Sequence, residues 1–279
     1  HHRFQLIHTD DLLKRANGEK IGVNWRNKMF FRTISTYFTI VTQVIFRYGH
    51  TSKADKILEE KGELAAEEYT AEIVADVCKK TLSKTGAKII VSGQENIPQD
   101  RNFVLIANHQ SMVDVFAIMQ TIGRPIGFIA KAELKKVPLL RKWMSSLGCI
   151  FMNRSDLRES MQALLEGIKK VKNGYSLCIF PEGTRTDGEM LEFKGGSFKL
   201  ATKSGAPILP LTIDGPHKVL EDNGLWIKNE TIRLTYHPII ETKGLTKEEQ
   251  NALPERVQSI IGSALKEGKG YGKDEDTGC

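Results

Sequence analysis

Seven short apolar runs alternate with amphipathic stretches between residues 87 and 240, and this alternation constrains the fold more than any other feature. Several runs are continuously apolar, which is typical of strands buried on both faces of a parallel sheet. The stretches between them place apolar residues at helical spacing. The expected strands are 88–93, 102–108, 125–131, 148–153, 176–180, 207–213 and 231–237, and the expected helices are 112–121, 133–146, 156–172, 196–204 and 246–266. The sequence therefore predicts an α/β fold with a mostly parallel central sheet flanked by helices.

Changes in residue composition and apolar pattern divide the chain into four expected parts. These are a polar N-terminal segment at 1–28, a helical membrane-associating appendage at 29–86, an α/β domain at 87–267 and a flexible tail at 268–279. The first residues lack the apolar core of a cleavable signal. The chain begins His1-His2 without a methionine, which is consistent with a tag remnant, and Met29 is an alternative native start.

The appendage is expected to contain two helices. In the stretch 29–48, one helical face is apolar and consists of Phe30, Ile34, Phe38, Val41, Ile45 and Tyr48. A membrane span needs about 20 continuous apolar residues, and Arg32 and several hydroxyls interrupt this stretch. The pattern favours a helix lying in the membrane interface, with docking on the protein's own core as the alternative. The charged stretch 52–84, interrupted by Gly62, is predicted to be its partner helix.

Charge and cysteine content narrow the class of partner. The net charge of +6 suits an anionic membrane surface, a phosphorylated small molecule or nucleic acid, although solubility alone explains it equally well. Cys78, Cys149, Cys178 and Cys279 show no CxxC spacing. We therefore expect neither a metal site nor a disulfide framework. The few cysteines favour a reducing, cytosolic compartment.

A histidine and an aspartate follow the expected strand 102–108. Asn108 and His109 lie at its carboxyl end, where α/β sheets form their sites. Ser111 is expected to be the N-cap of the next helix and Asp114 its third residue. Residues five apart on one helix point about 140° apart, so His109 and Asp114 meet only if the loop turns back. Asp114 would then bind one ring nitrogen and leave the other as a base. In the alternative, Asp114 only stabilises the helix N-terminus electrostatically.

A second polar stretch, FPEGTRTDG, follows the strand at 176–180. Gly183 lets a ligand approach the backbone closely, and the planar fork of Arg185 matches phosphate or carboxylate. Glu182 is placed to orient a positive group or a hydroxyl. A solvated surface turn is the alternative. A third strand, GCIFMNR, ends in Arg154, and a lone arginine at such a position is more often solvated than functional.

Four blocks in order resemble those of the glycerolipid acyltransferases. FPEGTR matches its block letter for letter, while Met-Asn stands before Arg154 where Ile-Asp is commoner in the family. The H-x4-D spacing alone occurs by chance in many proteins, but all four blocks in order are specific. The closest subgroup is the 1-acyl-sn-glycerol-3-phosphate acyltransferases of bacterial type. The blocks are NHQSMVD at 108–114, GCIFMNR at 148–154, FPEGTR at 180–185 and APILPLTI at 206–213.

The resemblance implies an O-acyltransferase that makes phosphatidic acid for phospholipid biosynthesis. The fatty acyl group would pass from a thioester of acyl carrier protein or coenzyme A to the sn-2 hydroxyl of lysophosphatidic acid, with no cofactor or metal. His109 would be the general base and Asp114 its orienter, as in a triad whose hydroxyl belongs to the substrate. Ser111 would be a cap rather than a nucleophile, and Asn108 and Glu182 would support the motifs.

The resemblance also implies how the acceptor is held. Arg185 is the first choice for the acceptor's phosphate, followed by Lys131 and Arg154, and backbone N–H groups around Gly183 are candidate donors. We expect the helix at 29–48 to seat the enzyme on the phospholipid surface, at the cytoplasmic face of the inner membrane, as a peripheral or monotopic protein. No nucleic-acid partner is expected.

Three alternatives remain at this point. The acceptor could be another lysophospholipid or lipid, the protein could be a non-catalytic membrane-binding protein, or the acyl group could pass through an acyl-enzyme on Ser111. Acyl-chain length, donor and oligomeric state cannot be predicted from the sequence.

Overall fold

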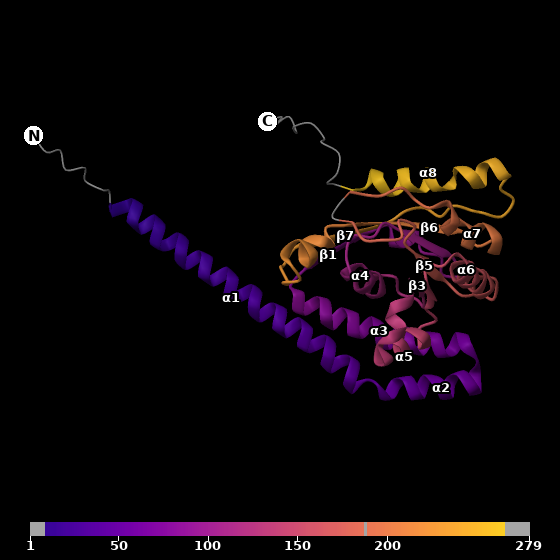
Figure 1. Ribbon diagram of the computed structural model, residues 1–279, viewed down its shortest axis with the longest axis horizontal. Coiled ribbons are helices and arrows are strands. Elements are labelled where there is room, and N and C mark those ends of the chain that lie inside the picture. The colour runs from indigo at the N-terminus through magenta and orange to yellow at the C-terminus, as the bar shows by residue number, and fades with distance from the viewer. Residues whose placement is uncertain (1–8, 187–188, 266–279) are drawn as a thin grey trace, which may run out of the picture.

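The computed structural model describes residues 9–186 and 189–265. Within these ranges seven strands form one sheet, and helices cover it (Figure 1). Each predicted strand contains the observed one, except that β6 extends one residue further, to Asp214. The predicted fold class is therefore confirmed. The strands are β1 Lys88–Ser92, β2 Val104–Ala107, β3 Gly127–Lys131, β4 Ile150–Met152, β5 Leu177–Ile179, β6 Ile208–Asp214 and β7 Thr231–Tyr236.

The order of the strands places two loops side by side. The order is β1-β7-β6-β2-β5-β3-β4, and every neighbouring pair is parallel except β6 with β7. β2 lies between β6 and β5, with Val104 level with both Ile208 and Leu177. Because parallel strands end at the same edge, the loops that follow β2, β5 and β6 meet there.

The helices pack on the sheet in two layers. Along β2, Leu105 belongs to a core shared with α4 and with α3 (Glu63–Thr85), whereas Val104 and Ile106 belong to a core shared with α6, α7 and α8. This alternation is the period of two expected for a strand buried on both faces. Figure 1 shows α3 and α8 on opposite sides of the sheet. The helices of the domain are α4 Val113–Thr121, α5 Pro138–Ser146, α6 Leu157–Lys172, α7 Lys199–Ser204 and α8 Lys247–Ser263, with short 3-10 turns at η1 Gln94–Asn96, η2 Ala132–Lys136, η3 Gly195–Phe198, η4 Pro216–Val219 and η5 Glu221–Asn223.

The N-terminal helices differ from the prediction in two ways. Helix α1 spans Thr9–Phe46, so it starts well before Met29 and crosses the predicted boundary at residue 28. The polar composition of that segment does not oppose a helix, because Lys, Arg, Leu and Glu are good helix formers. The second predicted helix is divided into α2 Gly49–Lys61 and α3 Glu63–Thr85, because Gly62 adopts a φ of 87°. The predicted tail at 268–279 lies outside the described residues.

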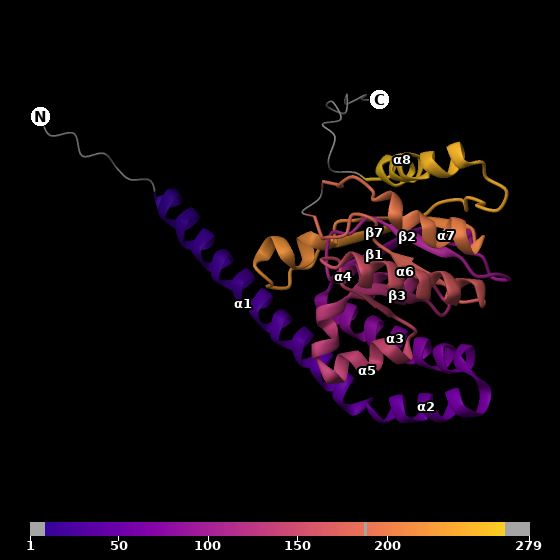
Figure 2. The same cartoon turned by 45° about the vertical axis from the view of Figure 1, so that its right-hand side comes forward.

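Helix α1 turns its apolar face away from the protein. All six residues of the predicted face are exposed, and the buried side chains on this helix include Thr33 and Thr36. Figures 1 and 2 both show α1 projecting beyond the domain. Docking of this face on the protein's own core is therefore not what the structure shows. The part Arg26–Phe46, with 21 residues, is also long and apolar enough to cross a membrane by length and composition.

Candidate active site

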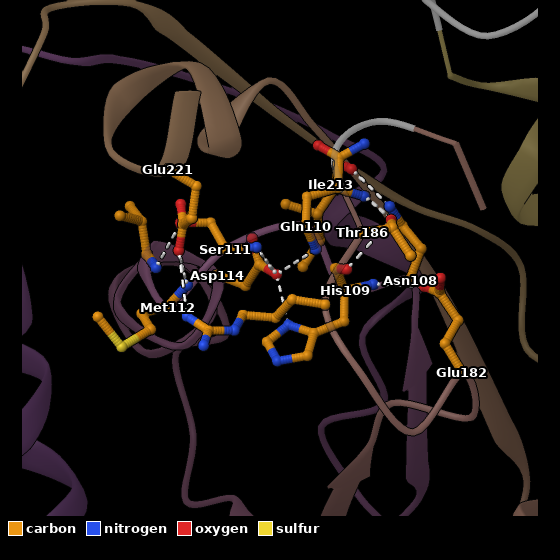
Figure 3. Close-up of polar contacts among 12 residues, drawn as sticks. Asn108, His109, Gln110, Ser111, Met112, Asp114, Glu182, Thr186, Ile213 and Glu221 are labelled. Carbon is orange, nitrogen blue, oxygen red and sulfur yellow. Dashed lines mark hydrogen bonds and ion pairs between the residues drawn. The ribbon is translucent and has the colours of Figure 1, made fainter. Parts of the chain in front are cut away.

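His109 and Asp114 are in contact at the carboxyl edge of the sheet (Figure 3). The Nδ1 atom of His109 lies 2.7 Å from Oδ2 of Asp114. His109 precedes helix α4, whose first residue is Val113, while Asp114 lies in the first helical turn. The loop therefore turns back over its own helix, and the contact predicted from the spacing is confirmed.

The carboxylate of Asp114 organises this loop. Its Oδ2 atom also accepts the backbone N–H groups of Gln110 at 2.8 Å and Ser111 at 3.0 Å, and its side chain is fully buried. Burial raises the pKa of Asp114, and the hydrogen bonds from His109, Ser111 and Gln110 oppose this rise. An oxygen that accepts two backbone N–H groups is best assigned to an ionised carboxylate, so Nδ1 of His109 bears the ring hydrogen. The other ring nitrogen, Nε2, is then free to accept a proton.

Ser111 is not the N-cap of α4, as the sequence had predicted. Met112 occupies that position without a side-chain cap bond, and Asp114 is the second helical residue rather than the third. The helix starts later because Asp114 itself binds the N–H groups of the two residues after His109. Ser111 Oγ accepts the N–H of Val113 at 3.0 Å, and the residue is fully buried. Its hydroxyl is therefore used locally, in stabilising the start of the helix.

Asn108 and Gln110 join the loop after β2 to the end of β6. The amide of Asn108 exchanges two 2.8 Å hydrogen bonds with the backbone of Ile213, and Gln110 Oε1 accepts the N–H of Gly215 at 3.0 Å. Asn108 is thus a supporting residue, as expected. Gln110 was missed by the sequence analysis, since its partner is 105 positions away.

The FPEGTR loop after β5 holds His109 from its other side. The ring of Phe180 stacks on the imidazole, with centroids 4.0 Å apart and planes inclined by 15°. Glu182 accepts the backbone N–H of His109 at 2.7 Å and that of Leu191 at 3.0 Å, and Thr186 donates its N–H to the His109 carbonyl at 2.9 Å. Burial raises the pKa of Glu182. Glu182 therefore binds backbone rather than a positive group or hydroxyl, and the contact of Phe180 was not predicted.

The three predicted cations have different partners. Arg185 is half-exposed, with Nη1 3.3 Å from Oε1 of Glu221. Arg154 donates from Nη1 to the carbonyl oxygen of Gly183, so it contacts the loop that contains Arg185. Lys131 is exposed and pairs instead with Glu133 at 3.4 Å. The structure thus brings Arg154 and Arg185 to one loop and gives Lys131 a separate partner.

Gly183 has a structural reason to be glycine. Its φ is +78°, and a Cβ atom at this position would lie 2.8 Å from Nζ of Lys194, a cation that the sequence analysis did not single out. Its N–H donates to the carbonyl of Phe180 at 3.2 Å, so this N–H is engaged within the turn rather than offered to a ligand. Across the described ranges, no group of three or more His, Cys, Asp and Glu side chains is arranged to hold a metal ion.

Comparison with known proteins identifies the family. The Acyltransferase family profile matches residues 88–214, the region that contains the four sequence blocks. The 1-acyl-sn-glycerol-3-phosphate acyltransferase of Borreliella burgdorferi is 33% identical over 189 residues, which cover 67% of this chain and 76% of that protein. The chain belongs to the glycerolipid acyltransferase family.

Further relatives extend this result to the fold. The 1-acyl-sn-glycerol-3-phosphate acyltransferase of Saccharomyces cerevisiae is 33% identical over 187 residues, covering 65% of this chain and 61% of that protein. The crystal structure of the 1-acyl-sn-glycerophosphate (LPA) acyltransferase PlsC from Thermotoga maritima superposes with a TM-score of 0.73 at 31% identity, over 85% of this chain and 94% of that one. The protein is thus an O-acyltransferase with the fold of its family.

Proposed function

We propose that the protein transfers a fatty acyl group from a thioester of acyl carrier protein or coenzyme A to the sn-2 hydroxyl of 1-acyl-glycerol-3-phosphate. The product is phosphatidic acid. The observation that supports this chemistry best is His109, whose Nδ1 is held by a buried carboxylate while the ring remains partly exposed. The names of the bacterial and yeast relatives support this choice of acceptor.

The chemistry requires one base that later acts as an acid. A sugar-like hydroxyl is a poor nucleophile at neutral pH, so Nε2 of His109 removes its proton as the oxygen attacks the thioester carbonyl. The tetrahedral intermediate collapses, the carbon–sulfur bond breaks, and the imidazolium returns the proton to the departing thiolate. Asp114 stabilises the imidazolium during these steps. No acyl-enzyme forms, and Ser111 stays a structural residue.

The acceptor's phosphate is bound by Arg185 in this proposal, with Arg154 and Lys131 as further cations. The guanidinium of Arg185 is half-exposed and can form paired hydrogen bonds with a phosphate. Arg154 contacts the same loop through Gly183, so it can assist directly or by holding the loop. Lys131 lies on the exposed surface at the end of β3, the strand next to β5.

We also propose that helix α1 binds the enzyme to a membrane. Its exposed apolar face would enter the interface of the cytoplasmic leaflet, and basic residues would be attracted to anionic lipid. A lipid acceptor could then reach His109 from the bilayer while the thioester arrives from the aqueous side. The enzyme would be a peripheral or monotopic protein of the inner membrane.

An acceptor panel tests the proposal. Purified protein is assayed with acyl carrier protein and coenzyme A thioesters, against lysophosphatidic acid, a lysophosphodiester and monoacylglycerol. We expect transfer to lysophosphatidic acid, and we expect Arg185→Ala to lower kcat/KM for it by about 10- to 100-fold, as loss of a charge-assisted hydrogen bond predicts. Equal transfer to monoacylglycerol would contradict the phosphate clamp, and no transfer to any acceptor would contradict the function.

A further inference from the structure

Glu221 connects the candidate phosphate clamp to the catalytic helix. It lies in η5, in the link between β6 and β7, and its Oε1 atom accepts the backbone N–H of Met112 at 3.0 Å (Figure 3). The same oxygen lies 3.3 Å from Nη1 of Arg185. Its second oxygen is buried without a hydrogen-bond partner among the described residues. One carboxylate is therefore shared between the N-terminus of α4 and Arg185.

The position of Glu221 is fixed from two sides, by the start of α4 and by contacts of its link with α1. Met112 is the N-cap of α4, and the N-terminal end of a helix attracts a negative charge. Further along the link, Ile227 donates its N–H to Thr33 Oγ1 at 2.8 Å, and the carbonyl of Leu225 accepts the Tyr37 hydroxyl at 3.0 Å. The link is thus bound to α1 on one side and to α4 on the other. A phosphate that reaches Arg185 meets a carboxylate that cannot move far away.

We propose that Glu221 is a positioning residue that acts as a built-in counter-ion of Arg185, so that it orients the guanidinium and weakens its hold on phosphate. This inference rests on the proposed function, because it takes Arg185 as the clamp of the acceptor. Lysophosphatidic acid and phosphatidic acid have the same phosphate monoester. Attraction to Arg185 therefore stabilises substrate and product alike, which lowers KM without raising kcat and slows release of the product. A fixed carboxylate beside the arginine offsets this uniform binding.

The variant Glu221→Gln separates charge from structure. The amide keeps an oxygen for the Met112 N–H but loses the negative charge. We expect KM for lysophosphatidic acid to fall about two- to fivefold, the range measured for partly exposed ion pairs. The inhibition constants of phosphatidic acid and of sn-glycerol 3-phosphate, a soluble phosphate monoester, should fall by the same factor, and kcat should not rise. Glu221→Ala removes the oxygen as well and should also lower kcat.

A double-mutant cycle makes the inference specific to Arg185. In an Arg185→Ala background, Glu221→Gln should leave both KM and the inhibition by sn-glycerol 3-phosphate unchanged. An unchanged or raised KM, or unchanged or raised inhibition constants, in the single Glu221→Gln variant would overturn the proposal. It would also be overturned if Glu221→Gln lowered these constants in the Arg185→Ala background. If the wild-type protein transfers nothing to lysophosphatidic acid, the proposed function fails separately. Calorimetric binding of sn-glycerol 3-phosphate to the same four proteins then still decides whether Glu221 opposes Arg185.

Discussion

The H-x4-D spacing occurs three times in this chain, once within helix α2, from His50 to Asp55, and twice after a strand, as HQSMVD from His109 and HKVLED from His217. Both histidines follow the carboxyl end of a central strand, β2 in the first case and β6 in the second. In both pairs Nδ1 of the histidine contacts the aspartate, at 2.7 Å for Asp114 and 2.9 Å for Asp222. The two pairs are therefore alike in sequence, in position on the sheet and in contact distance.

The pairs differ in which partner is buried. The side chain of Asp114 is 0% exposed and that of His109 is 17% exposed, whereas His217 is 8% exposed and Asp222 is 39% exposed. A general base must be reached by its substrate, and its orienting carboxylate works best away from water. Only the first pair meets both conditions. The loops around an H-x4-D sequence, and not its spacing, therefore decide whether its histidine can act as a base.

Replacing each histidine by alanine tests this difference, and the loss of kcat in His109→Ala is the largest effect that we expect. His109→Ala should lower kcat by about 10²–10⁴, the usual contribution of a general base. His217→Ala is the matched control and should keep kcat within about threefold while lowering the melting temperature, because a buried side chain is lost. Steady-state acyl transfer and thermal unfolding measure both. Equal losses of kcat in the two variants would remove the distinction.

Replacing the two aspartates should also lower kcat more for the first pair than for the second, but the difference should be smaller than for the histidines. In Asp114→Asn the amide NH2 can donate to Nδ1 of His109, which favours the tautomer with hydrogen on Nε2 and removes the free base. We expect kcat to fall on the order of 10², the lower end of what a general base contributes. Asp222→Asn changes a side chain that faces solvent, so kcat should stay within about twofold. The comparison would be wrong if Asp222→Asn were the more damaging of the two.

If the first pair serves a lipid acceptor, the exposed face of α1 should bind membranes. Replacing Phe38 and Phe46 by glutamate should reduce co-flotation with anionic vesicles by at least about tenfold, since each large apolar side chain contributes about 1.5–3 kcal/mol on burial. The matched control replaces Leu157 and Leu165, which are similarly exposed on α6. Similar losses in both double variants would show that general surface charge, and not α1, governs flotation.

Glu67 is a buried carboxylate with no histidine partner in the described part of the chain. Changing it should affect the stability of the protein and not acyl transfer, and by less than the changes above. Glu67 on α3 contacts Lys170 on α6 at 2.6 Å, and burial raises its pKa to about 7. Since the folded-state pKa exceeds the unfolded value of about 4.5, the folded protein binds the proton more tightly. Stability should thus fall as pH rises from about 4.5 to 7 and level off above 7. Melting curves of wild type and Glu67→Gln should diverge by a few degrees across this range, and parallel curves would contradict the account.

Much of the fold could be predicted from local patterns. All seven strands were predicted from short apolar runs. Strands β2 and β5 are apolar at every position because every position is buried, whereas the burial of β7 alternates with a period of two. The start of α1 at Thr9 could not be predicted, because a helix that projects from the domain needs no apolar stripe to mark its beginning. The division of α2 from α3 depends on a single residue, Gly62, whose positive φ the sequence only allows.

The site could be predicted only where its contacts are local. His109 and Asp114 are five residues apart, so their contact could be inferred from a turn before a helix. The ring of Phe180 on His109 and the bond from Met112 to Glu221 join residues 71 and 109 positions apart. No periodicity predicts such contacts. Spacing also gives His217 and Asp222 the same standing as the first pair, and only burial separates them.

The most direct test is which ring nitrogen of His109 bears the hydrogen when the imidazole is neutral. Nitrogen-15 NMR of histidine-labelled protein at neutral pH distinguishes the two ring tautomers, and His109→Ala assigns the resonance. We expect the neutral ring to bear its hydrogen on Nδ1, donated to Asp114, with Nε2 free, and we expect a shift toward the other tautomer in Asp114→Asn. A wild-type His109 with its hydrogen on Nε2 would contradict the account, because the ring would then have no base to offer the acceptor.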